Sequence, residues 1–169
     1  MGQDNRDLVM PTAEEKILLG SLLGKIVSVY AVQVLPADWL VSYAADAFLL
    51  RAGNMSLMIV PRVCSLSEED WNGGPIGVID CSNSWEADTA HAKVIPVIES
   101  FDLTSLVAVV FDDQYEDDGG VRALRFGGLH QEFFVTVELF YSMTIHLKPE
   151  SVAELDAAYA CAGARYESI

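Results

Sequence analysis

The stretch FFVTVELFYSMTIHL, residues Phe133–Leu147, indicates the fold most clearly. Apolar residues recur at every second position, which is the period of a β-strand with one face toward a core. That face comprises Phe133, Val135, Val137, Leu139, Tyr141, Met143, Ile145 and Leu147. Extended throughout, the stretch would reach about 50 Å, which is far beyond the usual length of a strand. We therefore predict that a bend, bulge or turn divides it near Tyr141-Ser142.

Further strands are predicted on the N-terminal side of this stretch. Ile26–Leu35 is rich in β-branched residues, which favour strands. Asp46–Arg51 and Met55–Val63 flank Ala52-Gly53-Asn54. This pattern is typical of a hairpin, because Asn and Gly tolerate the positive φ of tight turns. Shorter strands are expected at Ile76–Cys81, Val94–Phe101 and Leu106–Phe111, and another that carries Arg122 and Arg125.

Helices are predicted near both ends of the chain. Thr12-Ala-Glu-Glu15 and Ser151-Val-Ala-Glu154 have the spacing of capping boxes. The first helix would start at Thr12, and the second would end near Gly163 after an apolar stripe. That stripe comprises Val152, Leu155, Ala158 and Tyr159. The expected fold is α+β, a mainly antiparallel sheet bracketed by an N-terminal and a C-terminal helix, in one domain over residues 1–169 with residues 1–11 flexible.

The charge of the chain is strongly unbalanced. It has 25 acidic residues against 10 Lys and Arg, a formal net charge of −15, yet 51% of its residues are hydrophobic. This combination predicts an apolar interior inside a negative surface, which would attract a cationic partner or hold water in a salty solvent. Nucleic acid is excluded as a partner, because a phosphate backbone would be repelled.

The densest acidic stretch is expected to bind a basic protein. Its partner-binding candidates are Asp112, Asp113, Tyr115, Glu116, Asp117 and Asp118. As a calcium loop it fails, because Asp117 stands where an EF-hand needs Gly and Ala123 where it needs Glu. A solvated hairpin tip and an adventitious cation site are the alternatives. Arg122 and Arg125 follow on the next strand, and neutralisation of the stretch by them would weaken the binding hypothesis.

The sequence predicts no catalytic residues, no metal site and no cofactor. Histidine occurs three times, and no zinc, nucleophile-elbow or phosphate-loop motif is present. Cys81 beside Asp80 is interpreted as a core thiol rather than a nucleophile. One alternative is a ligand or enzyme pocket that uses His130, Thr136 and Glu138. Glu138 stands among apolar residues, where burial would raise its pKa.

Several features favour a reduced, cytoplasmic protein. Cys64, Cys81 and Cys161 form no C-x-x-C pair, which argues against a disulfide framework. Asp4, Arg6 and Asp7 have the wrong charge order for a secretory signal. Ile17–Leu35 is long enough for a membrane span, but Lys25 near its middle makes insertion costly, so no membrane association is expected.

One short stretch resembles a known family. Leu35-Pro-Ala-Asp38-Trp39, with Phe48-Leu49 and Gly53-Asn54 downstream, is similar to the L-P-x-D-aromatic opening of the SUKH superfamily of bacterial immunity proteins. The similarity covers about twenty residues. The family continues to a closely spaced Asn-Gly-Gly, whereas Gly53-Asn54 has the reverse order and Asn72-Gly73-Gly74 lies farther along. The resemblance implies an immunity function and assigns no residue roles.

The function expected from the sequence is non-enzymatic. We expect an acidic protein-binding module, an immunity-protein or antitoxin-like inhibitor of a basic partner. The alternatives are a dedicated secretion chaperone, commonly a homodimer that uses an apolar groove or sheet edge, and the small-ligand or enzymatic α+β domain with a pocket around Glu138.

Overall fold

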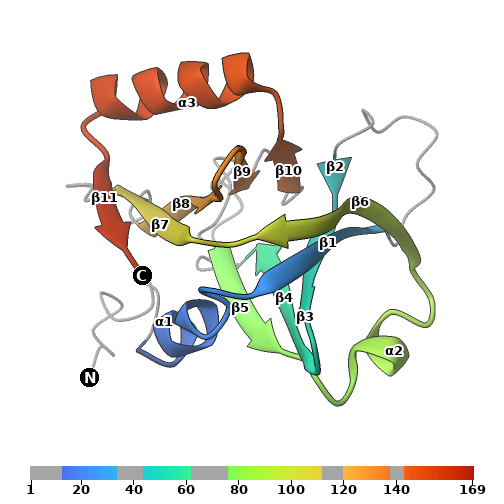
Figure 1. Ribbon diagram of the computed structural model, residues 1–169. Helices are drawn as coiled ribbons and strands as arrows, with labels where there is room; N and C mark the ends of the chain where they lie inside the picture. The colour runs from blue at the N-terminus through green and yellow to red at the C-terminus, as the bar shows by residue number, and fades with distance from the viewer. Residues whose placement is uncertain (1–12, 34–43, 62–75, 112–119, 138–142) are drawn as a thin grey trace, which may run out of the picture.

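The computed structural model describes residues 13–33, 44–61, 76–111, 120–137 and 143–169. Strands dominate these ranges (Figure 1). In chain order the elements are α1 (Ala13–Gly20), β1 (Ile26–Gln33), β2 (Ala44–Ala45), β3 (Ala47–Ala52), β4 (Met55–Pro61), β5 (Ile76–Asp80), α2 (Trp85–Asp88), β6 (Lys93–Asp102), β7 (Ser105–Phe111), β8 (Gly120–Gly127), β9 (Glu132–Val137), β10 (Met143–His146), α3 (Pro149–Cys161) and β11 (Arg165–Ser168).

The strands form two sheets, so the predicted α+β fold with one sheet bracketed by helices is wrong. Sheet A has the order β5-β4-β3-β1-β6, and sheet B has the order β11-β7-β8-β9-β10-β2. Every described strand pair is antiparallel. The chain passes from sheet B to sheet A through Asp46 alone, and returns through Leu103-Thr104. The described part of the chain is mainly β, with three short helices.

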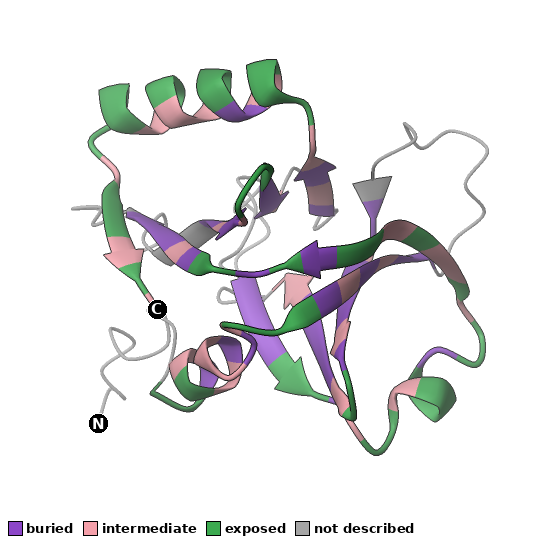
Figure 2. Cartoon of the chain, in the orientation of Figure 1, coloured by how far each residue is buried: buried purple, intermediate pink, exposed green. Residues whose placement is uncertain are grey.

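Two layers form because both sheets direct apolar side chains toward a common core. Sheet A contributes alternate residues such as Val27 and Val29 of β1 and Phe48 and Leu50 of β3. Sheet B contributes another set, Leu106, Ala108, Val110, Leu124, Phe126, Phe133, Val135, Met143 and Ile145. Each sheet thus buries the apolar face of the other, as in a β-sandwich (Figure 2).

The helices are too small to take the place of a second layer. Val152 is the one buried residue of α3. Together with Leu155 and Tyr159 of the same helix, it packs against Phe134 on the outer face of sheet B. The helix begins at Pro149 after Lys148, so Ser151 does not cap it. The other predicted cap, Thr12, lies outside the described residues, as do residues 1–11.

The predicted hairpin and the predicted division of the stretch Phe133–Leu147 are confirmed, although the expected point of division, Tyr141-Ser142, lies outside the described residues. β3 and β4 pair across the turn at Gly53, which has φ of 60°. β9 and β10 are separate antiparallel strands in which Val137 lies opposite Met143, so the stretch Phe133–Leu147 does fold back on itself. The predicted inward residues Phe133, Val135, Met143 and Ile145 are all in the core.

The outer face of sheet A carries its own apolar cluster. Leu49 and Met58 are buried there with Cys81, and Trp85 of α2 packs against them. The guanidinium of Arg51 lies 4.2 Å from the centre of the Trp85 ring, a cation–π geometry. These contacts position the short helix α2, which the sequence did not predict.

The turn between β8 and β9 lies very close to the connection between the sheets. A Cβ atom on Gly128 would stand 2.9 Å from the carbonyl oxygen of Asp102 and 2.9 Å from Cζ of Phe101. The backbone oxygen cannot move without disturbing the crossover to Ser105. The glycine is therefore required by close packing.

We predict that Gly128→Ala lowers the free energy of unfolding by about 1–3 kcal/mol, the usual cost of overpacking. Gly20→Ala is the matched control, because its Cβ would meet only Ile169 Cγ2 at 3.9 Å. Urea denaturation of both variants and the parent measures the effect. Equal midpoints for Gly128→Ala and the parent would contradict the close approach.

The two ends of the described chain are joined by an ion pair. Lys16 of α1 bonds to Glu167 of β11, and Arg165 makes a second ion pair with Glu167 at 3.1 Å. The hydrogen bond from Lys16 is the main cause that lowers the pKa of Glu167, against a smaller opposing effect of burial. A carboxyl group whose pKa is lower in the folded state stabilises the fold above its unfolded pKa and loses that effect as pH falls.

We therefore expect Glu167→Gln to be less stable than the parent above about pH 5, with the difference shrinking as the pH falls through the lowered pKa of Glu167, where the parent carboxylate becomes protonated. Thermal unfolding over a series of decreasing pH values measures it, with Glu150→Gln as the control for loss of an exposed charge. A stability difference that does not change with pH would show that the ion pair contributes nothing.

Candidate functional site

Four connections of the chain leave and re-enter the described strands at the same end of the sandwich. In sheet A, Val32 of β1 lies opposite Ala47 of β3, and Pro61 of β4 lies opposite Ile76 of β5. In sheet B, Phe111 of β7 lies opposite Gly120 of β8. These strand ends therefore lie side by side within each sheet.

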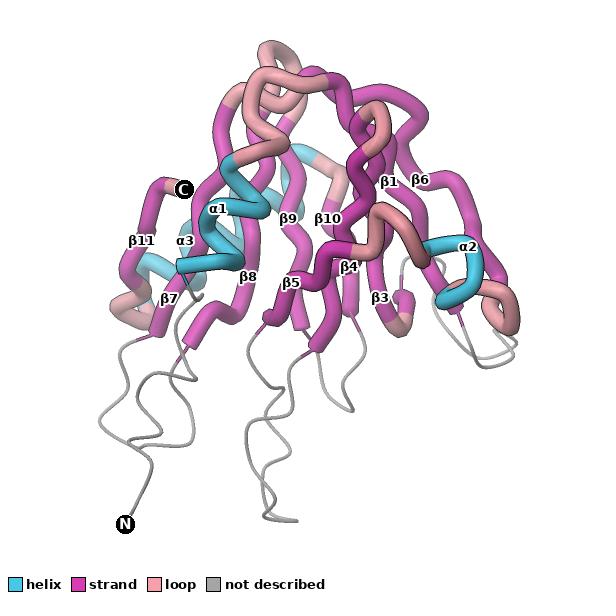
Figure 3. The backbone as a smooth tube through the Cα atoms, turned by 90° about the horizontal axis from the view of Figure 1, so that it is seen from below, coloured by secondary structure: helices cyan, strands magenta, loops and turns pink. Residues whose placement is uncertain are grey.

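The link between the sheets shows that this is one end and not two. Met143, where β10 starts, pairs with Ala45 of β2. Asp46 alone separates Ala45 from Ala47, and the Asp46 amide donates to the carbonyl of Val32, near the end of β1. Figure 3 shows the described ends of β4, β5, β7, β8 and β10 on the same side.

The sequence that connects these strand ends is strongly acidic. Residues 34–43, 62–75, 112–119 and 138–142 carry one, three, five and one acidic residues, ten in all, against the single basic residue Arg62. They comprise 37 of the 169 residues but hold ten of the 25 acids. The predicted partner-binding residues Asp112, Asp113, Tyr115, Glu116, Asp117 and Asp118 lie outside the described residues, as does Glu138.

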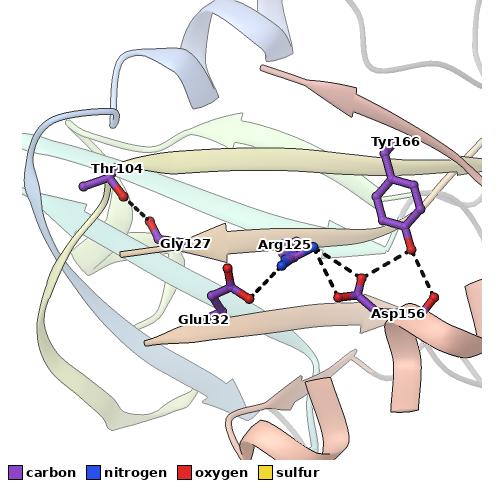
Figure 4. Close-up of polar contacts among 6 residues, drawn as sticks. All are labelled: Thr104, Arg125, Gly127, Glu132, Asp156 and Tyr166. Atoms are coloured by element: carbon purple, nitrogen blue, oxygen red, sulfur yellow. Dashed lines mark hydrogen bonds and ion pairs between the residues drawn. The ribbon is translucent and has the colours of Figure 1, made fainter. Parts of the chain in front are cut away.

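Within the described residues, Arg125 pairs with two carboxylates that do not belong to the acidic stretch. Its guanidinium bonds to Glu132 at 2.7 Å and to Asp156 of α3 at 3.2 Å (Figure 4). Burial would lower the pKa of Arg125, but the bond to Glu132 and the charge of Asp156 outweigh it and raise the pKa. Arg125 thus ties α3 to sheet B.

Asp156 also accepts a hydrogen bond from the hydroxyl of Tyr166, at 3.3 Å from Oδ1. Burial and the Asp156 charge raise the pKa of Tyr166, so the hydroxyl stays protonated as a donor. This clamp of Arg125, Glu132, Asp156 and Tyr166 was not predicted from the sequence. The i, i+7 spacing of Arg125 and Glu132 across a Gly-Gly turn is the signal that could have revealed its first pair.

A pocket of about 460 Å³ opens between the β8–β9 turn and the first half of α3. The turn contributes Gly128–Glu132, and the other wall is made by Leu147, Pro149, Val152, Ala153 and Asp156. Since β9 runs from this turn toward Val137, the pocket lies at the end of the sandwich opposite to the acidic connections.

Two residues of the alternative ligand site, His130 and Thr136, are among the described residues, and they do not lie close together. His130 is exposed on the β8–β9 turn, whereas Thr136 is buried near the far end of β9. Thr136 Oγ1 lies 3.1 Å from Nε2 of His146 on the neighbouring strand. A shared pocket for His130 and Thr136 would have to span most of β9, about 17 Å or more.

The cysteines give no reactive site among the described residues. Cys81 is 2% exposed, and burial, followed by the charges of Asp88 and Asp80, raises its pKa. Its thiol therefore stays protonated, as expected for a core residue. Cys161 is exposed on α3, and Cys64 lies outside the described residues.

Two searches of the described residues were negative. They contain no group of three or more His, Cys, Asp or Glu arranged to hold a metal ion. Within the same ranges, each helix is too short or too polar to cross a membrane.

Comparison with known proteins found no matching family, no similar curated protein and no similar solved structure. The resemblance of Leu35–Trp39 to the SUKH opening therefore remains a similarity of one short stretch, which itself lies outside the described residues.

We predict that Asp156→Asn speeds hydrogen exchange of the α3 amides by about three- to tenfold, because a partly exposed ion pair and its hydrogen bond contribute about 1 kcal/mol. Exchange in β7, β8 and β9 should not change. Glu154→Gln, an exposed residue of the same helix, is the control. If both variants exchange like the parent, the clamp does not hold the helix.

Proposed function

We propose that this protein is a non-enzymatic binding protein of the cytoplasm whose acidic end engages a basic protein, as an immunity protein or antitoxin does. The observation that supports the proposal is that the strand ends flanking residues 62–75 and 112–119, which hold eight acidic residues, lie at one end of a two-layer scaffold. Connections between strands at one end of a sandwich are a common place for recognition.

The distribution of charge favours recognition over a uniform negative surface. The four connections hold about a fifth of the residues, two fifths of the acids and one of the ten basic residues. A negative surface that serves only to bind water does not require its charge to be concentrated in a few segments. Such a concentration speeds the approach of a cationic partner and repels nucleic acid.

The ion pairs of Arg125 also support the proposal. Its two carboxylate partners are Glu132 and Asp156, which belong to the turn and helix side of sheet B. Two ion pairs outside the stretch at residues 112–118 thus already occupy the guanidinium. That stretch keeps its charge for a partner unless Arg122 compensates it.

The chaperone alternative receives less support from the described sheet edges. β6 is the longest edge strand, but it carries Pro96 and two register shifts against β1. Proline and bulges are features that prevent another strand from pairing with an edge. An added strand or a homodimer through β6 is therefore disfavoured.

The proposal predicts salt-sensitive binding that depends on the acidic end. A variant with Asp112, Asp113, Asp117 and Asp118 changed to Asn should bind a cationic partner from native lysate at least about tenfold more weakly at low salt. Recovery is measured by affinity capture and mass spectrometry, followed by association rates at low and high salt with the purified partner.

A variant with Glu86, Glu99, Glu150 and Glu154 changed to Gln is the control, since it loses the same charge at exposed positions of α2, β6 and α3. It should keep most of the binding. Recovery of no cationic protein at low salt, or equal weakening of both variants, would overturn the proposal.

A further inference from the structure

Two carboxylates, those of Glu132 and Asp156, line the pocket between the β8–β9 turn and α3, and no Lys or Arg is among its lining residues within the described chain. Arg125 pairs with both carboxylates and offsets one of the two negative charges. Both oxygens of Asp156 contact Arg125, and Oδ1 also accepts from Tyr166, whereas Glu132 contacts Arg125 through Oε2 alone. The side chain of Glu132 is 45% exposed, so a cation in the pocket would meet the carboxylate of Glu132 rather than that of Asp156.

One carboxylate oxygen of Glu132, Oε1, is available to a ligand. Oε2 accepts the bond from Arg125, while Oε1 is turned away from the guanidinium (Figure 4) and has no hydrogen-bond partner among the described residues. Because Arg125 fixes the carboxylate, Oε1 is held in place before any ligand arrives. Such preorganisation reduces the entropy that binding would otherwise cost.

The opposite wall of the pocket is apolar and rigid. Val152 is 6% exposed and anchors α3 on sheet B, and Ala153 stands beside it at the surface of the helix. Leu147 and Pro149 continue this wall into the connection from β10. The volume of about 460 Å³ is in the lower part of the range found for small-molecule sites.

We propose that this pocket binds a small organic cation, a primary ammonium carried by a compact apolar body. The ammonium donates to Glu132 Oε1, and the apolar body packs against Val152 and Ala153. This site lies at the far end of the sandwich from the acidic connections, so it does not depend on the protein-binding function proposed above.

Amide chemical shifts of the full chain during titration with benzylammonium test the site. We expect saturable shifts centred on Leu129, His130 and Ala153. Benzyl alcohol, which has the same ring without the charge, should bind at least about threefold more weakly, and benzoate should not bind. Glu132→Gln should weaken benzylammonium about three- to fivefold, and Ala153→Trp should abolish its binding by filling the pocket.

Glu154→Gln and Ala157→Trp are the matched controls, because both residues are exposed on α3 and neither lines the pocket. They should bind benzylammonium like the parent. If Ala153→Trp disturbs the spectrum as a whole, Ala153→Leu gives the same test with less bulk. Equal binding of the three probes, no saturation below about 20 mM benzylammonium, or full binding by a filled variant would overturn the proposal.

Discussion

Phe133 of β9 packs against aromatic rings of both sheets, and the arrangement of the whole molecule depends on this contact. Its ring is stacked on Phe126 of β8 with centres 4.7 Å apart, and it meets Phe101 of β6 edge-on at 5.0 Å. Phe101 belongs to sheet A and the other two rings to sheet B. Because Phe101 comes just before the crossover into β7, the same cluster also fixes where the chain changes sheets.

Much of the local structure could be predicted from the period of the apolar residues, and the layer arrangement could not. The alternation around Phe133 identified the inward residues Val135, Met143 and Ile145 correctly. The opposite face of this strand carries Phe134 and Thr136, which are also buried, Phe134 beneath α3. Apolar residues on both faces of a strand require two covering layers. Sheet A covers one face and α3 the other, whereas the expected fold had only one sheet.

The crossovers and the last strand leave almost no signal in the sequence. Asp46 alone separates a strand of sheet B from a strand of sheet A, and no local pattern distinguishes it from a residue inside one strand. β11 is short and largely exposed, and it is held by backbone pairing with β7 and by the Lys16–Glu167 ion pair. The clamp around Asp156 could not be predicted for a related reason, since it joins residues from four elements, β8, β9, α3 and β11, whose proximity only the fold creates.

The two-layer scaffold brings strand ends that are far apart in the sequence to one end of the molecule. Phe111 and Gly120 are paired across the β7–β8 ladder, and Val137 and Met143 are paired across the β9–β10 ladder. Backbone hydrogen bonds thus fix the described strand ends on either side of residues 112–119 and 138–142. Fixing the ends of a segment removes part of the entropy that ordering it would otherwise cost. The core around Phe133 fixes this arrangement of strand ends, on which the binding of a basic partner that we propose depends.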